Sequence, residues 1–142
     1  MRYIILILFS FSFLISCSQN LRSSHKYKCA EQLTESEINN YIENSFEDYT
    51  DEDLNFLADI TTYIMDSNPE KDSYECFFNQ HQKNLLVLDV YGLENEEKID
   101  KTVCGLLENK KIKLPRTTII LFHKYINGFD DGGIIVGLKI SK

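Results

Sequence analysis

The sequence lacks the residue arrangements on which common enzyme chemistry depends. No serine, cysteine or histidine stands in a pattern that indicates a nucleophile with its base. Only six glycines are present, and none belongs to a glycine-rich loop of the kind that cradles phosphate. No basic surface interleaved with aromatic residues is indicated, so nucleic acid is not an expected partner. We therefore expect a protein that is not an enzyme.

Metal-ligating patterns are missing as well. Zinc sites usually combine two close pairs of ligands, whereas here only Cys76 and His81 stand at a suitable spacing. His123 is expected simply to be one residue of an alternating strand. The acidic runs 48–53 and 130–131 do not supply the alternating oxygen ligands, central glycine and distal glutamate of a calcium loop. No metal or cofactor is predicted.

Long hydrophobic runs are scarce, and the one at residues 3–15 is too short to span a membrane with certainty. It follows the basic residue Arg2 and ends at residues 14–17, which read LISC. This layout is typical of a secretory signal. Residues 14–17 also resemble the lipobox of bacterial lipoproteins, in which the cysteine is lipidated and becomes the first residue of the mature chain.

The resemblance implies that Cys17 carries acyl chains and that residues 1–16 are removed as a signal peptide. Each buried methylene contributes about 0.8 kcal/mol, so two or three chains hold stably where one binds marginally. The polar residues 17–30 would then form a tether, and residues 31–142 a single domain. Ser18 after the cysteine implies outer-membrane delivery, facing the periplasm. A bacterium with one membrane would keep the protein on the outer face of its plasma membrane.

Negative charge is concentrated in one part of the chain. Residues 31–75 contain fourteen aspartates and glutamates but only one basic residue, Lys71. Repulsion disfavours nucleic acid and anionic lipid there, whereas a basic protein partner or loosely held divalent cations are permitted. A solvated helix face is the simpler explanation. The candidate partner surface comprises Glu43, Glu47, Asp48, Asp51, Glu52 and Asp59.

The cysteines allow at most one intramolecular disulfide. Besides Cys17, the mature chain contains Cys29, Cys76 and Cys104, an odd number in a compartment that favours oxidation. Three pairings are open. We prefer Cys76–Cys104, because both residues lie in the part expected to pack as one unit. Cys29 would alternatively pin the tether to the domain.

Two helices are predicted in the first half of the domain. Thr34 and Glu37 fit a capping box, and the apolar residues that follow recur at helical spacing, which predicts a helix over 35–48. Thr50, followed by three acidic residues, begins a second helix that runs to about residue 66. The very short link predicts an αα-hairpin.

Residues 69–82 allow two interpretations. Asn68 as a cap and Pro69 in the first helical position favour a third helix. A short strand at 74–79 followed by a polar turn fits almost as well. We expect the helix.

The second half predicts a β-α-β-β unit. Residues 85–91 are apolar nearly throughout, which is typical of a strand buried on both faces. A helix at 94–109 and a strand at 117–126 follow, and then a hairpin loop at 127–133 and a strand at 134–140. The predicted fold class is α+β, with helices covering one face of a small sheet.

Asp89 interrupts this apolar strand near its C-terminal end. In sheets with β-α crossovers, ligands gather outside the carboxyl ends of strands. A buried carboxylate would have a raised pKa and could act as an acid or base. The simpler alternatives are that Asp89 caps the next helix, pairs with a lysine or reaches solvent.

Together these patterns predict a lipid-anchored envelope protein that binds another protein. Envelope-assembly accessories, pilotin-like chaperones and immunity proteins are compatible in size and tether. The expected partners are the bilayer, through acylated Cys17, and a protein that carries basic charge. The alternative is a small-molecule-binding domain or small envelope enzyme with its site near Asp89.

Overall fold

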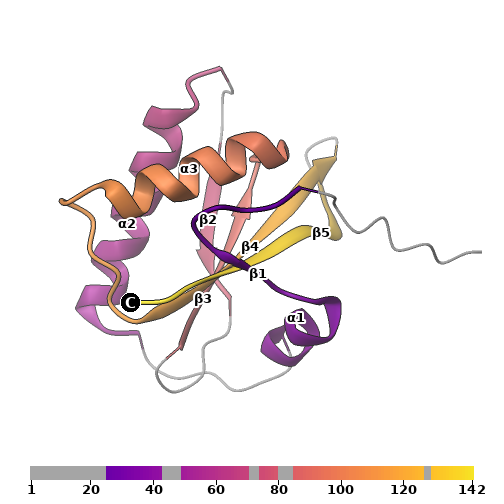
Figure 1. Cartoon of the computed structure of the whole chain (residues 1–142), viewed down its shortest axis with the longest axis horizontal. Helices are drawn as coiled ribbons and strands as arrows, with labels where there is room; N and C mark the ends of the chain where they lie inside the picture. The colour runs from indigo at the N-terminus through magenta and orange to yellow at the C-terminus, as the bar shows by residue number, and fades with distance from the viewer. Residues whose placement is uncertain (1–24, 43–48, 71–73, 80–84, 127–128) are drawn as a thin grey trace, which may run out of the picture.

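The computed structural model describes residues 25–42, 49–70, 74–79, 85–126 and 129–142. The predicted signal peptide and Cys17 lie outside these ranges. The described elements, in chain order, are β1 (Glu31–Gln32), α1 (Glu35–Ile42), α2 (Asp51–Ser67), β2 (Glu75–Phe78), β3 (Leu85–Tyr91), α3 (Glu96–Glu108), β4 (Thr117–Ile126) and β5 (Phe129–Ile140) (Figure 1). None of the helices in these ranges has the length and apolar character needed to cross a membrane.

The strands form one mixed sheet in the order β1-β5-β4-β3-β2. β3 and β4 are parallel, and every other neighbouring pair is antiparallel. α3 connects β3 to β4, so the predicted α+β class and β-α-β-β order are confirmed. β5 begins at Phe129, inside the predicted hairpin loop, and the two-residue strand β1 was not predicted.

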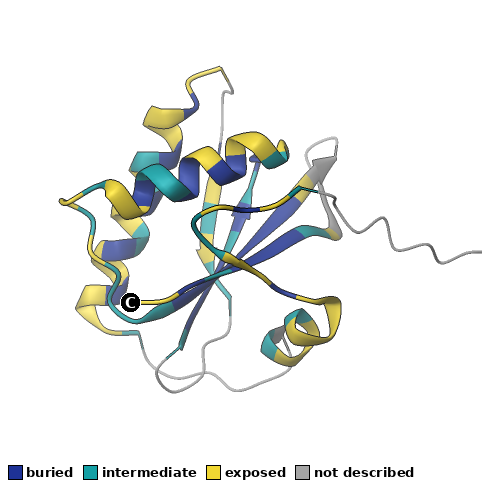
Figure 2. Cartoon of the chain, in the orientation of Figure 1, coloured by how far each residue is buried: buried dark blue, intermediate teal, exposed yellow. Residues whose placement is uncertain are grey.

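β3 is buried on both faces of the sheet, as its apolar run predicts. Leu86, Val87, Leu88 and Val90 have no exposed surface. In Figure 2 the buried colour runs along the middle of the sheet. Side chains alternate across a strand, so burial of consecutive residues requires a layer on each side. The strand ends at Gly92, whose φ of 98° lies in the region that favours glycine.

Helices cover both faces of the sheet, not one. α2 and α3 pack on the face that contains Leu88 and Phe122. On the opposite face Ile38 of α1 packs against a cluster that includes Leu121. The contact is close, because a Cβ added at Gly137 would lie 2.9 Å from Ile38 Cγ1. The predicted αα-hairpin is therefore wrong, since α1 and α2 lie on opposite sides of β3 and β4.

Capping boxes begin both helices: the one at Thr34 is predicted, and at Thr50 the predicted cap is completed by Asp53. The backbone N–H of Glu37 donates to Thr34 Oγ1 at 3.3 Å, and the N–H of Thr34 donates to Glu37 Oε2 at 2.7 Å. Thr50 and Asp53 exchange the same bonds, at 3.2 and 2.8 Å. α2 ends at Ser67, close to the predicted residue 66. Of the first predicted helix, residues 43–48 lie outside the described part.

Residues 75–78 form a strand, so the preferred helix over 69–82 is wrong and the alternative is correct. β2 pairs antiparallel with β3, placing Phe77 opposite Asp89. Cys76 and Phe78 pack toward α2, whereas Glu75 and Phe77 are exposed. Pairing with an apolar neighbouring strand overrides the local signal of Pro69, which is weak on its own.

A buried ion pair joins α2 to the start of β4. The Asp53 side chain is 1% exposed and that of Arg116 is 19% exposed. Arg116 donates from Nε to Oδ1 at 3.1 Å and from Nη2 to Oδ2 at 2.5 Å, a bidentate pair. Burial alone would raise the pKa of Asp53, but the hydrogen bonds from Arg116 and Thr50 outweigh it and hold that pKa below its ordinary value.

Asp53→Asn is expected to lower the free energy of unfolding by about 3 kcal/mol, because it removes the buried carboxylate to which Arg116 donates two hydrogen bonds. Because the pKa of Asp53 is lowered in the folded protein, the unfolded state binds more protons at acid pH. The contribution of Asp53 to the free energy of unfolding is therefore complete above about pH 5, and it is lost as pH falls through the pKa of Asp53 in the folded protein. Urea titrations at pH 7 and at about pH 2 measure both effects.

The matched control for this experiment is Asp51→Asn, on the exposed side of the same helical turn. It should change stability by a few tenths of a kcal/mol only, roughly the size of a helix-dipole contact. Equal stability of the two variants at both pH values would contradict the assigned role of Asp53.

Candidate functional site

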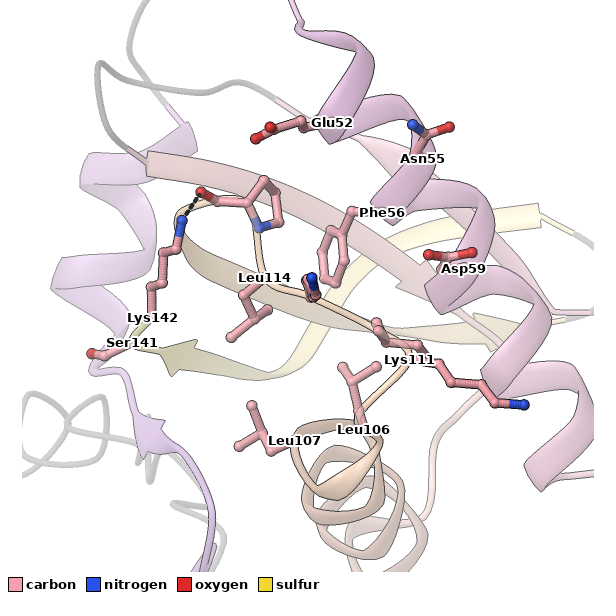
Figure 3. A pocket seen from close by; sticks show the side chains of 13 residues that line it. Glu52, Asn55, Phe56, Asp59, Leu106, Leu107, Lys111, Leu114, Ser141 and Lys142 are labelled. Atoms are coloured by element: carbon pink, nitrogen blue, oxygen red, sulfur yellow. Dashed lines mark hydrogen bonds between the residues drawn. The ribbon is translucent and has the colours of Figure 1, made fainter.

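A cleft of about 740 Å³ opens between α2 and the C-terminal end of α3 (Figure 3). The loop before β4 and the last two residues of the chain form its other side. Its lining residues are Glu52, Asn55, Phe56, Asp59, Leu106, Leu107, Lys111, Ile112, Lys113, Leu114, Pro115, Ser141 and Lys142.

The floor of the cleft is apolar. The ring of Phe56 extends from α2 toward Leu114 and Leu106 (Figure 3). Phe56 and Leu106 belong to the main core and are 2% and 3% exposed, whereas Leu107 at the rim is 39% exposed. The core therefore reaches the surface at the bottom of this cleft.

The walls of the cleft carry opposite charges. Glu52 and Asp59 are exposed on the α2 side, seven residues apart and so separated by about 10 Å along the helix axis. Lys111 and Lys113 are exposed on the facing side. Within the described ranges, no ion pair joins these acids to the lysines of the cleft. Charges of both signs thus remain available to a ligand.

Local structure fixes the geometry of these walls. The Thr50 cap starts α2, and burial of Phe56 and Ile60 sets its rotation, which brings Glu52 and Asp59 to the cleft. α2 and α3 approach closely at Gly105 of α3, where an added Cβ would lie 2.2 Å from the hydroxyl oxygen of Tyr63 on α2.

The opposite wall is held from two sides. Arg116, bonded to Asp53, follows Pro115 in the chain. Lys142 donates from Nζ to the Pro115 carbonyl at 3.0 Å, a bond drawn in Figure 3. The loop that carries Lys111 and Lys113 is therefore anchored at its end.

Of the candidate partner surface, Asp51, Glu52 and Asp59 are exposed on α2, and the other three acids lie outside the described residues. α2 contains no basic residue, and its exposed surface includes two large apolar side chains, Leu54 (51% exposed) and Met65 (47%). The sequence does not predict the opposite wall of the cleft, called here the lysine wall, which comprises Lys111, Lys113 and Lys142. Its residues follow α3 and β5, and no sequence pattern indicates that these two segments meet.

Asp89 is bonded inside the sheet. Its Oδ1 accepts a hydrogen bond from Asn79 Nδ2 at 3.0 Å and lies 2.7 Å from His123 Nε2. The Tyr91 ring stacks on the His123 ring with centroids 4.4 Å apart. The charged cleft and a hollow beside His25 are both lined by other residues. The geometry thus favours a structural pairing of Asp89 with His123.

The described ranges contain no group of three histidine, cysteine, aspartate or glutamate side chains that could hold a metal ion. His81, the partner considered for Cys76 in a metal site, lies outside those ranges. His123 is on β4, as its place in an alternating strand predicts, and its bonded neighbour is a carboxylate.

The disulfide joins Cys29 to Cys104, and Cys76 is a free cysteine, so the preferred Cys76–Cys104 pairing is wrong. The Cα atoms of the bonded pair are 5.2 Å apart. The two cysteines are 75 residues apart in the chain, and in the chain-entropy model a bridge over that distance stabilises the fold by about 4 kcal/mol. Cys76 packs under α2, where burial raises the pKa of its thiol to about 11.

Cys29 pairs with Cys104 because part of the predicted tether packs against α3. Tyr27 is 7% exposed, and the Lys28 N–H donates to Asp100 Oδ1 at 2.8 Å. His25 Nε2 lies 3.6 Å from Asp100 Oδ2. These contacts bring Cys29 to α3, so the folded domain begins by residue 25 and not at residue 31.

No known protein family, curated protein or solved structure matches this chain. No relative therefore lends it a function. A function can be inferred from three features: the charged cleft, the exposed face of α2 and the N-terminal segment 25–29, which is held to α3.

Peptide mapping without reduction should recover the Cys29–Cys104 bridge and an unmodified Cys76. Burial and the raised pKa should keep Cys76 unreactive toward a thiol reagent at pH 8, where less than about 1% of such a group is thiolate. Denaturation with the disulfide intact should expose it. A Cys76–Cys104 peptide, or rapid labelling of the native protein, would contradict this arrangement.

Proposed function

We propose that the protein is a lipid-anchored envelope lipoprotein that acts by binding another protein through α2 and the cleft beside it. The observation that carries this proposal is the exposed face of α2, which combines acidic side chains, no cation and two exposed large apolar residues. Protein interfaces commonly place apolar contacts within a polar rim. An exposed apolar side chain beside unpaired acids fits that anatomy.

The charge of α2 selects the kind of partner. Asp51, Glu52, Asp59 and Asp66 are exposed and belong to a region in which acids far outnumber bases. Such a surface attracts a basic protein patch and repels nucleic acid and anionic lipid headgroups. Complementary charge accelerates encounter, and the apolar residues supply contact area that charge alone does not provide.

The attachment of the N-terminal segment supports the same function. The described chain begins at His25, beside residues 94–97 at the N-terminal end of α3, and the cleft lies at the other end of that helix. Thirteen residues of helix span about 20 Å. With Cys17 lipidated, residues 18–24 would extend over at most about 25 Å. Residue 25 thus lies at the end of α3 remote from the cleft, so a tether that precedes it would leave the cleft open to a partner.

A small-molecule site is the alternative function. Its support is the volume of the charged cleft, about 740 Å³, which falls in the range of ligand pockets. Nothing in the bonding of Asp89 adds to it, because that carboxylate is engaged by Asn79 and His123. The capture experiment that follows separates the two functions.

Reversing three acids of α2, Glu52→Lys, Asp59→Lys and Asp66→Lys, should reduce partner capture at least tenfold without unfolding the domain. The lipidated protein is crosslinked mildly in its native envelope, and co-purified proteins are quantified by mass spectrometry. Capture by the wild-type protein should weaken as salt rises, because exposed charges are screened.

The matched control reverses Glu35, Glu75 and Glu97, which are exposed away from the cleft and change the net charge equally. It should retain the partner. Cys17→Ser should lose the membrane fraction but keep the partner in solution. Equal capture by both triple variants would contradict the proposed surface, and no stoichiometric protein with the wild type would favour the small-molecule alternative.

A further inference from the structure

We infer that the charged cleft receives a segment of the partner polypeptide in which an apolar side chain stands between a basic and an acidic one. The inference rests on the proposed function and specifies the chemistry that the partner must present. Three features of the cleft carry it: an apolar floor, walls of opposite charge and exposed polar groups between the charges.

The floor calls for an apolar side chain. Phe56 and Leu106 lie beneath the cleft as part of the buried core, and the apolar surface open to water comes from Leu107, Ile112 and Leu114. An aliphatic or aromatic group placed there would extend the core and displace water from apolar surface. A fully charged segment would leave this surface unused.

The walls require both signs of charge in one ligand. Glu52 and Asp59 face the cleft from α2, and Lys111 and Lys113 lie across it, unpaired with these acids within the described ranges. A nucleic acid would be repelled by the acids. A fatty acid would satisfy the lysines but leave the acids without a counter-charge. A polypeptide segment with a basic group on one side and an acidic group on the other satisfies both walls.

Polar groups between the charges suit a peptide backbone. The Asn55 amide lies on α2 between Glu52 and Asp59, and it can both donate and accept a hydrogen bond (Figure 3). Ser141 lines the far end of the cleft, beside Lys142. A peptide group has one donor and one acceptor, which the Asn55 amide complements.

The cleft is also formed before any ligand binds. The Asp53–Arg116 pair and the Lys142–Pro115 bond hold its two sides, so a ligand need not order them. A preformed site loses less conformational entropy on binding than one that must close. Specificity then depends on how well the charges of the segment match those of the walls.

A charge-swap experiment tests the inference with the purified full-length protein. Twelve-residue peptides are selected from a random phage library on the immobilised protein, and synthetic copies are measured by fluorescence anisotropy. Selected peptides should share a leucine or aromatic residue flanked by Lys or Arg on one side and Asp or Glu on the other. Glu52→Lys with Asp59→Lys should weaken them at least tenfold.

The same peptides with their basic residues changed to glutamate should bind that variant more tightly than they bind the wild type. The control variant, Glu75→Lys with Glu97→Lys, should bind the original peptides as the wild type does. The inference is overturned if selection enriches no such pattern, if the reversed variant binds the original peptides unchanged, or if the swapped peptides do not regain affinity.

These results are independent of the capture experiment. Loss of an envelope partner from the α2 variant, with no effect on the selected peptides, would overturn the segment chemistry and leave the proposed function standing. Peptides that behave as expected, with no protein captured from the envelope, would contradict the proposed function and support the chemistry of the cleft.

Discussion

The ion pair between Asp53 and Arg116 is the interaction on which the rest of the site depends. It joins residues 63 positions apart, at the first turn of α2 and the start of β4. Glu52 precedes the aspartate and Pro115 precedes the arginine, so both walls of the cleft begin beside this pair. Because Asp53 also closes the capping box, one carboxylate fixes where α2 starts and how far it lies from the loop opposite. A buried pair of this kind specifies geometry more than it adds net stability.

Features with a strong local cause could be predicted from the sequence. The caps at Thr34 and Thr50 and the buried strand at 85–91 follow from patterns a few residues long, and the structure contains all three. The face on which α1 packs has no such cause. An apolar stripe shows that a helix is buried but not which surface it packs against. The short link between the two helices predicts a hairpin, but the sheet lies between α1 and α2. The preferred Cys76–Cys104 pairing is wrong for the same reason, because the alternative role of Cys29 depends on contacts of residues 25–28 with α3.

Only the acidic side of the candidate site could be predicted from the sequence. The excess of acids was visible in the sequence, and the structure exposes Asp51, Glu52 and Asp59 on one helix. The lysine wall comes from segments that follow α3 and β5, which meet only after the sheet has formed. Asp89 drew attention because a charge interrupts an apolar strand. Its hydrogen-bonded neighbours, Asn79 and His123, lie 10 and 34 residues away, so their role could not be read locally.

The proposed partner docks in the cleft whose two walls begin beside the Asp53–Arg116 pair. Hydrogen exchange measured by mass spectrometry, on the protein alone and crosslinked to its captured partner, tests this claim most directly. The claim predicts added protection in residues 52–59 and 106–115, with little change in β2 or in the segment around Asp89. Protection confined to β2 and β3, with the cleft unchanged, would contradict it and move the docking surface to the β2 edge of the sheet.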